Sequence, residues 1–204
     1  MHSNWLVGID EVGRGPLAGP VAVGAVLVAA DFAWSHIDGV TDSKQLTSKK
    51  REEIAVQAQD LMRHGQLRYS VAMTTAPVID QIGIVRSIDR ALVRSLQQVV
   101  DGQSLPYEEI LVKLDGGLRA PQKWVHQETI IKGDAREPVI GLASIVAKVA
   151  RDTYMRQLAG RAAYGPYDFG TNKGYGTRAH RAAIAQNGFS DVHRQSYCRN
   201  IELL

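Results

Sequence analysis

Two adjacent acidic residues at the end of an apolar strand constrain this chain more than any other feature. The apolar residues of Trp5–Ile9 predict a short β-strand, and Asp10 and Glu11 follow it directly. Neighbouring side chains of a strand point to opposite faces, so both carboxylates cannot face solvent. Burying a carboxylate without a partner is costly. The folded chain must therefore place something beside this pair that offsets its negative charge.

Two further acids occupy similar positions. Asp115 follows an apolar strand predicted at Ile110–Leu114, and Asp134 comes one residue after a short strand predicted at Glu128–Lys132. Carboxylate oxygens at strand ends are the ligands that Mg²⁺ or Mn²⁺ prefers, and these ions keep open positions for a phosphate. The pattern predicts a divalent-cation site. For any one of these acids alone, a turn or capping role remains the alternative.

Length and composition predict one soluble α/β domain. The 204 residues are 45% hydrophobic and 22% charged, which is ordinary for a globular protein of this size. We expect a single domain over residues 1–204, with a helical, basic C-terminal portion from about residue 160. Further strands are predicted at Val21–Val28 and Leu67–Met73, and helices from a Thr47 cap to about His64 and at Ile84–Val100, Gly141–Gly160 and Arg178–Gln186.

Composition also limits the cellular compartments and the binding partners that we expect for this protein. The lone Cys198 excludes a disulfide framework and a multi-cysteine zinc site. No signal peptide is evident, and the longest apolar run, Val21–Ala30, is too short to span a bilayer, so we expect a cytoplasmic protein with no membrane contact. Residues 171–200 hold five basic residues and one acid. This excess favours a polyanionic partner, with a solvated helix face as the alternative.

The glycine-rich turn after Glu11 is not a nucleotide-binding motif. Gly13-Arg14-Gly15 and Gly19 are followed by a strand-like stretch, whereas a dinucleotide fingerprint needs a helix there, and the lysine of a P-loop is missing. The turn instead offers backbone that a ligand can approach closely and a guanidinium for phosphate. The scattered histidines have no zinc-like spacing, so we expect His126, His180 and His193 to be surface or hydrogen-bonded structural residues.

These residues together resemble the type 2 ribonuclease H family, ribonuclease HII. The resemblance spans roughly residues 5 to 197 and begins with the very specific block Gly8-Ile-Asp10-Glu11-Val-Gly13-Arg14-Gly15-Pro-Leu-Ala-Gly-Pro-Val. It continues in order through Asp42-Ser43-Lys44-Gln-Leu, Leu-Asp115-Gly, Lys132-Gly133-Asp134, Ala143-Ser144-Ile-Val-Ala-Lys148-Val-Ala-Arg151-Asp152-Thr-Tyr-Met155, Lys173-Gly174-Tyr175-Gly176-Thr177 and Gly188-Phe-Ser-Asp-Val-His193-Arg194.

The resemblance implies an endonuclease that cuts the RNA strand of RNA–DNA hybrids, and cuts duplex DNA 5′ of single ribonucleotides, leaving 3′-hydroxyl and 5′-phosphate ends. It implies an RNase H-like fold, a mixed five-stranded sheet flanked by helices with a helical C-terminal extension. It also implies a two-metal mechanism with Mg²⁺ or Mn²⁺. Carried over residue by residue, the catalytic and metal-binding acids are Asp10, Glu11, Asp115 and Asp134.

The same resemblance assigns substrate contacts. The loop Gly13-Arg14-Gly15 would read the 2′-hydroxyl at the junction between ribonucleotide and deoxyribonucleotide, and Tyr175 would stack on the adjoining sugar. Ser43, Lys44 and Lys148 would contact phosphate or support the site. We expect a monomer. The sequence also shows no glutamine-containing, aromatic tail of the kind that docks a sliding clamp.

The chain departs from the family pattern at three places, and two other functions stay open. Val12 and Leu142 each stand where the family usually has alanine, and Lys113 interrupts an apolar strand. For Lys113, an edge position or a phosphate contact are the alternatives. The competing functions are another two-metal nuclease or phosphoryl-transfer enzyme on the same fold, and a non-catalytic hybrid-binding module.

Overall fold

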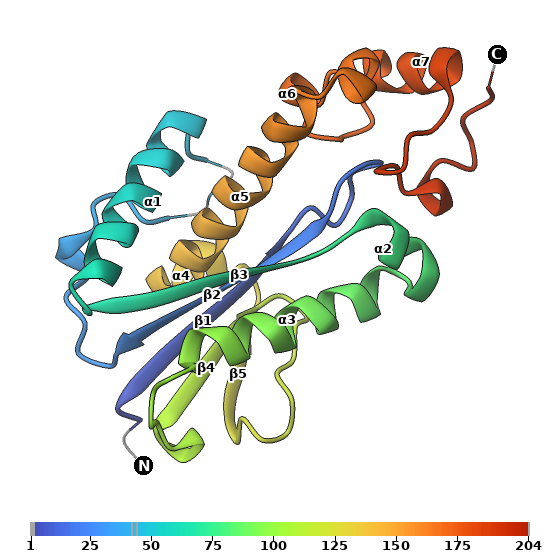
Figure 1. Ribbon diagram of the computed structural model, residues 1–204. Helices are drawn as coiled ribbons and strands as arrows, with labels where there is room; N and C mark the ends of the chain where they lie inside the picture. Colours follow the sequence, from blue (N-terminus) through green and yellow to red (C-terminus); the bar gives the residue numbers. More distant parts are fainter. Residues whose placement is uncertain (1–2, 42, 44, 204) are drawn as a thin grey trace.

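The computed structural model describes residues 3–41, 43 and 45–203, and its centre is one mixed β-sheet (Figure 1). The strand order is β3-β2-β1-β4-β5. β2 is antiparallel to both β1 and β3, whereas β4 is parallel to both β1 and β5. This confirms the predicted α/β fold with a mixed five-stranded sheet flanked by helices. The strands are β1 (Trp5–Val12), β2 (Val21–Ala29), β3 (Leu67–Thr74), β4 (Ile110–Asp115) and β5 (His126–Ile130).

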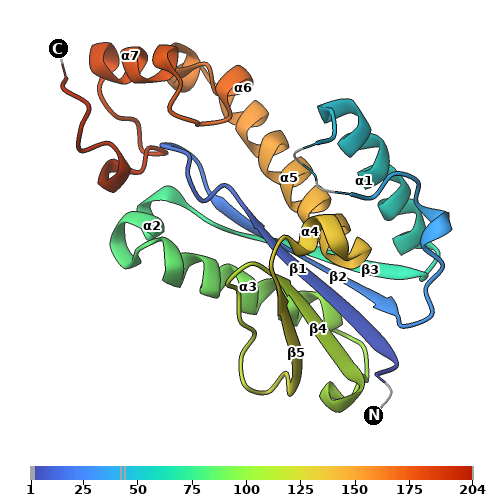
Figure 2. The ribbon, with the colours of Figure 1, turned by 180° about the vertical axis from the view of Figure 1, so that it is seen from behind.

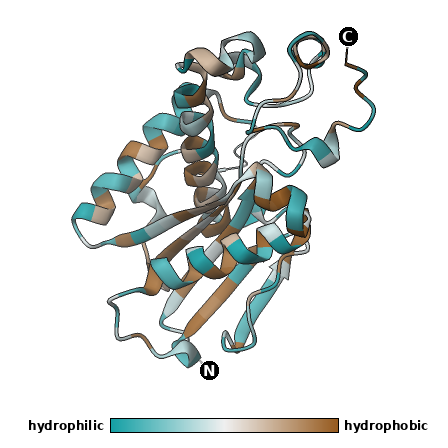
Figure 3. Ribbon diagram, turned by 45° about the vertical axis from the view of Figure 1, so that its right-hand side comes forward, coloured by the Kyte–Doolittle hydropathy of each residue, from teal (hydrophilic) through white to brown (hydrophobic). Residues whose placement is uncertain are grey.

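Helices cover both faces of the sheet, as Figures 1 and 2 show from opposite sides. One face packs against α2 (Ala76–Ile82) and α3 (Ile84–Val100), and the other packs against α1 (Ser48–Arg63), α4 (Gly133–Arg136) and α5 (Pro138–Ala159). Side chains along β2 alternate between the two faces of the sheet, so that Val23 packs on the α3 side and Val26 packs on the α5 side. The hydrophobic residues gather in these central strands (Figure 3).

Two glycines let α5 approach the sheet at backbone distance. A Cβ atom at Gly8 of β1 would lie 2.2 Å from the Val139 carbonyl oxygen, and one at Gly24 of β2 would lie 2.3 Å from the Ala143 carbonyl oxygen. No side chain fits at either place. The first half of α5 therefore lies directly on β1 and β2, close to the strand that carries the acidic pair.

The second half of α5 extends beyond the sheet into the C-terminal portion. This portion has its own apolar cluster, which includes Met155, Phe169 and Ile184. Leu17 and Ala18, from the loop after β1, belong to the same cluster, so that loop packs into the C-terminal portion (Figure 1). The elements there are η3 (Ala162–Tyr167), α6 (Phe169–Asn172), α7 (Arg178–Asn187) and η4 (Gln195–Tyr197); the short helices η1 (Trp34–His36) and η2 (Tyr107–Glu109) occur earlier.

The structure moves several predicted boundaries. β1 runs on to Val12, so the acidic pair lies within the strand and not behind it. β5 ends at Ile130 rather than Lys132, because Lys132 adopts a left-handed conformation with φ of 55° and turns the chain into α4. The helix predicted at Gly141–Gly160 starts three residues earlier, with Pro138 in its first turn, where a missing N–H costs nothing.

Other predictions hold, and three short α-helices, α2, α4 and α6, were missed. The Thr47 side chain caps α1 by accepting from the Lys50 N–H, and α3 has the predicted bounds. α2 was not predicted, because its seven residues include a proline and give too short a periodic pattern. Among the residues that the structure describes, no helix is long and apolar enough to cross a membrane.

Lys113 is explained by neither of the alternatives drawn from the sequence. β4 lies between β1 and β5, so Lys113 is not on an edge strand. Its Nζ donates at 2.8 Å to Glu137, the residue that precedes α5, and both side chains are largely buried. The lysine thus ties β4 to the start of α5.

Candidate active site

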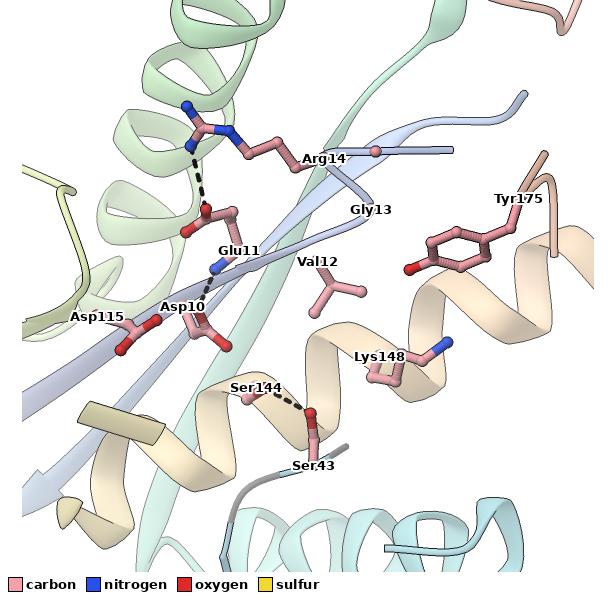
Figure 4. Close-up of a pocket in the computed structure, with 11 residues that line it drawn as sticks. Asp10, Glu11, Val12, Gly13, Arg14, Ser43, Asp115, Ser144, Lys148 and Tyr175 are labelled. Atoms are coloured by element: carbon pink, nitrogen blue, oxygen red, sulfur yellow. Dashed lines mark hydrogen bonds and ion pairs between the residues drawn. The ribbon is translucent and has the colours of Figure 1, made fainter. Parts of the chain in front are cut away.

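A pocket opens where β1 and β4 end, and it gathers residues from distant parts of the chain (Figure 4). β1 and the loop after it form one wall, α5 forms the floor, and Tyr175 closes the side opposite the acids. The parallel pairing of β1 with β4 explains the convergence, because the carboxyl ends of parallel strands meet at one edge. The lining residues are Asp10, Glu11, Val12, Gly13, Arg14, Gly15, Ser43, Asp115, Ser144, Lys148 and Tyr175.

Asp10 is the most strongly perturbed acid of the pocket. Its side chain is 4% exposed, and its Oδ1 accepts from the Glu11 N–H at 2.7 Å. The pKa of Asp10 is raised to about 8, mainly by burial and also by the neighbouring carboxylates of Asp115 and Glu11, while a hydrogen bond from Ser144 acts in the opposite direction. A positively charged group beside Asp10 would be needed to keep this carboxyl ionised at neutral pH.

Glu11 is the better compensated of the adjacent pair. Burial raises its pKa as well, but the Arg14 guanidinium, whose Nη1 lies 3.3 Å from the Glu11 Oε1, acts in the opposite direction. Arg14 is itself mostly exposed, with 57% of its side-chain surface open to solvent. Its guanidinium is therefore available to a ligand as well as to Glu11.

Asp115 anchors the segment that carries the fourth acid. It is the last residue of β4, and its Oδ1 accepts from the Gly133 N–H at 2.6 Å. Asp134 follows in the first turn of α4, where it is 5% exposed. Asp10, Glu11 and Asp115 thus line the pocket together, whereas Asp134 is buried in α4 and is not among the lining residues.

The donor chemistry of these four acids suits a hard divalent cation, because all of their ligand atoms are carboxylate oxygens. In the described part of the chain, however, no three acidic, histidine or cysteine side chains converge closely enough to hold one ion together. Carboxylates repel one another, so binding an ion requires these side chains to move closer around it.

A hydroxyl pair supports Asp10 from the floor of the pocket. Ser144 of α5 bonds to Asp10 through its side chain, and its Oγ lies 2.8 Å from the Ser43 Oγ. Arg51 holds this part of the Ser43 loop, since its Nη1 donates to the Ser43 carbonyl at 2.7 Å. Asp42 and Lys44, the neighbours of Ser43 in the motif, lie outside the described residues.

Lys148 lines the pocket, but its charge already has a partner. Its Nζ donates to both carboxylate oxygens of Asp152, at 2.6 and 2.7 Å. Burial lowers the pKa of Lys148, and the Asp152 contact acts against that shift. A phosphate near Lys148 would therefore meet an ion pair and not a free ammonium group.

Tyr175 presents an accessible ring. It is 42% exposed, its hydroxyl points into the pocket, and the guanidinium of Arg151 lies 5.8 Å from its ring centroid (Figure 4). The backbone of Tyr175 is fixed by an N–H bond to the Asn172 carbonyl at 2.9 Å. The residue thus combines a fixed main chain with a free ring face, as a stacking platform requires.

Two buried histidines hold the Tyr175 carbonyl. His193 Nδ1 accepts from the Ser190 N–H at 2.9 Å, which leaves the ring proton on Nε2. That Nε2 lies 3.1 Å from the Nε2 of His180, and His180 Nδ1 in turn donates to the Tyr175 carbonyl at 2.9 Å. Both rings are neutral in this chain of bonds. The structural roles predicted for His180 and His193 are confirmed, whereas His126 is half-buried on β5.

The basic excess of residues 171–200 is smaller at the surface than the sequence suggests. Arg194 is fully buried, and the half-buried Lys173 donates to the Gly170 carbonyl. The exposed cations of this region are Arg178, Arg181 and Arg199. Three of the five basic residues therefore remain to meet a polyanion.

Three residues that shape the pocket, Ser144, Arg151 and Arg194, have no role predicted from the sequence. Ser144 stands four residues before Lys148, so the helical period puts both on one side of α5. Arg151 and Arg194 lie in the family motifs quoted above, but a buried arginine gives the same sequence signal as an exposed one. Only the fold shows what these two arginines contact.

Comparisons with known proteins agree on one family. The family model for ribonuclease HII matches residues 7–200. Ribonuclease HII of Ralstonia nicotianae is 43% identical over 94% of this chain and 76% of its own length, and that of Syntrophus aciditrophicus is 40% identical over 94% and 83%. The crystal structure of ribonuclease H2 from Pyrococcus horikoshii OT3 is similar with a TM-score of 0.70, 26% identity and 97% of each chain covered.

The neutral histidine pair predicts acid-dependent stability. Burial, and then the neighbouring His180, lowers the pKa of His193 to about 4, while an unfolded histidine titrates near 6.5. Between those pH values the unfolded chain binds protons that the folded chain does not. The free energy of unfolding should therefore fall by about 2–3 kcal/mol as the pH drops from 6.5 to 4.

Urea denaturation between pH 4 and 7.5 measures this loss. His193→Gln should show a flatter pH profile than the wild type, whatever its stability at pH 7.5. His64→Gln, at a histidine with 67% of its side chain exposed, is the control and should leave the profile unchanged. Parallel profiles for His193→Gln and the wild type would show that this pair does not titrate on unfolding.

Proposed function

The chain belongs to the ribonuclease HII family of endonucleolytic ribonucleases H, and we propose that it cuts both RNA–DNA hybrids and duplex DNA containing a single ribonucleotide. In the second substrate the cut falls 5′ of the ribonucleotide and leaves 3′-hydroxyl and 5′-phosphate ends. The observation that carries this proposal is the shared pocket: three acids, the loop Gly13–Gly15 and the ring of Tyr175 face one space.

The acids of this pocket would hold Mg²⁺ or Mn²⁺, in keeping with the metal dependence of the family. Asp10, Glu11 and Asp115 line the space and supply oxygen ligands from two adjacent strands, and Asp134 would join from α4. Bound divalent ions supply an activated water and stabilise the leaving 3′-oxygen of the phosphodiester. The raised pKa of Asp10 supports this assignment, because its carboxylate needs a nearby positive charge to remain ionised.

The loop Gly13–Gly15 would recognise the ribose. Discriminating RNA from DNA at one nucleotide requires a contact with the 2′-hydroxyl. Gly15 is exposed, and a Cβ atom there would meet nothing within 4 Å, so the fold itself does not require glycine. A close approach of substrate backbone explains the glycine. Gly13 differs, because it has a φ of 90° and a Cβ there would collide with the Arg151 side chain.

The remaining alternative enzyme would act on a small phosphate or on DNA alone. Such a substrate would not contact the ring of Tyr175, which is 42% exposed and lies on the opposite side of the pocket from the acids. A sugar next to the scissile phosphate would reach that ring while the phosphate meets the acids. We therefore retain one proposed function, and cleavage of defined duplexes tests it.

Removing any acid of the pocket should abolish most cleavage. Asp10→Asn, Glu11→Gln and Asp115→Asn should each lose most turnover on a duplex with one ribonucleotide, measured in saturating Mn²⁺ with the product ends mapped. Asp89→Asn, at an exposed acid of α3, is the control. Without metal, Asp10→Asn should melt no lower than the wild type, because it replaces an acid whose charged form is disfavoured by burial and by the neighbouring carboxylates. Turnover near the wild-type value would exclude that residue as a ligand.

Adding one methyl group at Gly15 should weaken ribonucleotide recognition without affecting the fold. Gly15→Ala should keep the wild-type melting temperature, because its Cβ enters open space in the free protein. Its KM on the single-ribonucleotide duplex should rise about tenfold. Gly160→Ala, at an exposed glycine with φ of −74° at the end of α5, is the matched control. An unchanged KM for Gly15→Ala would contradict close contact between this loop and the ribose.

Truncating the ring of Tyr175 should impair the same substrate. If the ring stacks on a nucleotide, Tyr175→Ala should lose about 1–3 kcal/mol in kcat/KM at a lone ribonucleotide. Tyr175→Phe should retain most of the activity, since it keeps the stacking face. The exposed ring predicts little change in melting temperature. Equal damage from Phe and Ala would instead indicate that the hydroxyl makes the essential contact.

A further inference from the structure

The side chain of Arg194, far away in the sequence, holds the loop that connects β1 to β2. Arg194 is fully buried, and its three guanidinium nitrogens all donate to carbonyls of this loop. Nη2 reaches the Gly13 carbonyl at 2.7 Å, Nη1 the Arg14 carbonyl at 3.0 Å, and Nε the Gly19 carbonyl at 3.0 Å. A planar fork of donors suits this arrangement, and a lysine could not reproduce it.

The main chain beside Arg194 strengthens the attachment. The Arg194 N–H donates to the Leu17 carbonyl at 2.7 Å, and the Gly19 N–H donates to the Val192 carbonyl at 2.8 Å. The later part of the loop is thus bonded to the main chain of Val192–Arg194, and the guanidinium adds bonds to its first residues, Gly13 and Arg14. The exposed tip at Arg14 and Gly15 therefore rests on a buried, rigid support.

These bonds fix which way the tip presents its N–H groups. The C=O and N–H of a trans peptide point in opposite directions. Because the Gly13 and Arg14 carbonyls point down to Arg194, the N–H groups of Arg14 and Gly15 point away from it. Within the described residues neither N–H has an acceptor. Two free donors are thus held at the mouth of the pocket, where a sugar hydroxyl is an acceptor.

A second buried arginine joins this support to the Tyr175 segment. Arg151 donates to the carbonyls of Pro20 at 2.8 Å and Ala18 at 3.2 Å, and also to the Lys173 carbonyl at 3.0 Å. Burial, and then nearby Arg151, lowers the pKa of Arg194 to about 10, so both groups remain charged at neutral pH. All of these donors go to backbone carbonyls, where a guanidinium orients peptide groups.

From this geometry we propose that Arg194 is a positioning residue for ribonucleotide recognition. Its guanidinium orients the peptides of Gly13–Gly15 so that their N–H groups meet the 2′-hydroxyl. The inference rests on the proposed reading of the ribose by this loop. It assigns to Arg194 a role in discriminating ribose from deoxyribose, beyond a contribution to stability.

The discrimination ratio tests this role. The ratio is the inhibition constant of an all-DNA duplex divided by the KM of the same duplex carrying one ribonucleotide. Arg194→Lys keeps the buried charge but loses the three-point contact, and its ratio should fall about tenfold, the equivalent of one hydrogen bond. Ile184→Ala, in the same C-terminal cluster, is the control for stability. It should lower the melting temperature and leave the ratio unchanged.

The outcomes separate this inference from the proposed function. If the wild type shows a ratio near one, or Gly15→Ala leaves the ratio unchanged, the loop does not read the ribose and both ideas fail. If Gly15→Ala lowers the ratio and Arg194→Lys does not, the proposed function stands and the role of Arg194 is wrong. An equal loss of ratio in Ile184→Ala would also overturn it, since general destabilisation would then suffice.

Hydrogen exchange of the wild type provides a test that needs no folded variant. The Arg14 and Gly15 amides should exchange freely in the free protein and become protected when the single-ribonucleotide duplex binds, with less protection from the all-DNA duplex. Protection of these amides in the free protein would overturn the inference, because it would mean that they already have acceptors.

Discussion

The close approach of α5 to the sheet is the constraint on which the pocket depends. Gly8 and Gly24 bring the backbone of this helix within contact of β1 and β2, with no room for a Cβ atom. That contact sets the distance between α5 and the sheet, which allows Ser144 to bond to Asp10 and Lys148 to line the pocket. A side chain at either glycine would lift the helix and separate the hydroxyl support from the carboxylate it holds.

The distribution of charge follows from this packing. Negative groups gather at the ends of β1 and β4, and two buried guanidiniums lie beneath the adjoining loop. Burial, and then the neighbouring carboxylates, raise the pKa of Asp10, whereas the guanidiniums of Arg151 and Arg194 donate to carbonyls of the loop. The pocket therefore presents carboxylates at one end, whereas the charge of the two guanidiniums stays beneath the loop.

The sequence was sufficient for the sheet and for most of the acids, because both produce local patterns. Apolar runs gave the strands, the period of α3 gave its bounds, and three acids at strand ends proved to share a pocket. The likeness to a family supplied roles for Tyr175 and the glycine loop, and these roles remain predictions. The absence of Asp134 from the pocket lining could not be foreseen, since its position in α4 depends on the left-handed turn at Lys132.

The support of the loop Gly13–Gly15 comes from a residue near the end of the chain. Gly13 and Arg194 are separated by 181 positions, and Leu17 and Ala18 belong to the apolar cluster of the C-terminal portion. The segments that form the sheet are synthesised before Arg194, since the last strand ends at Ile130. A ribosome-bound chain that has completed its sheet therefore still lacks the support of the loop, although it already carries the acids of β1 and β4.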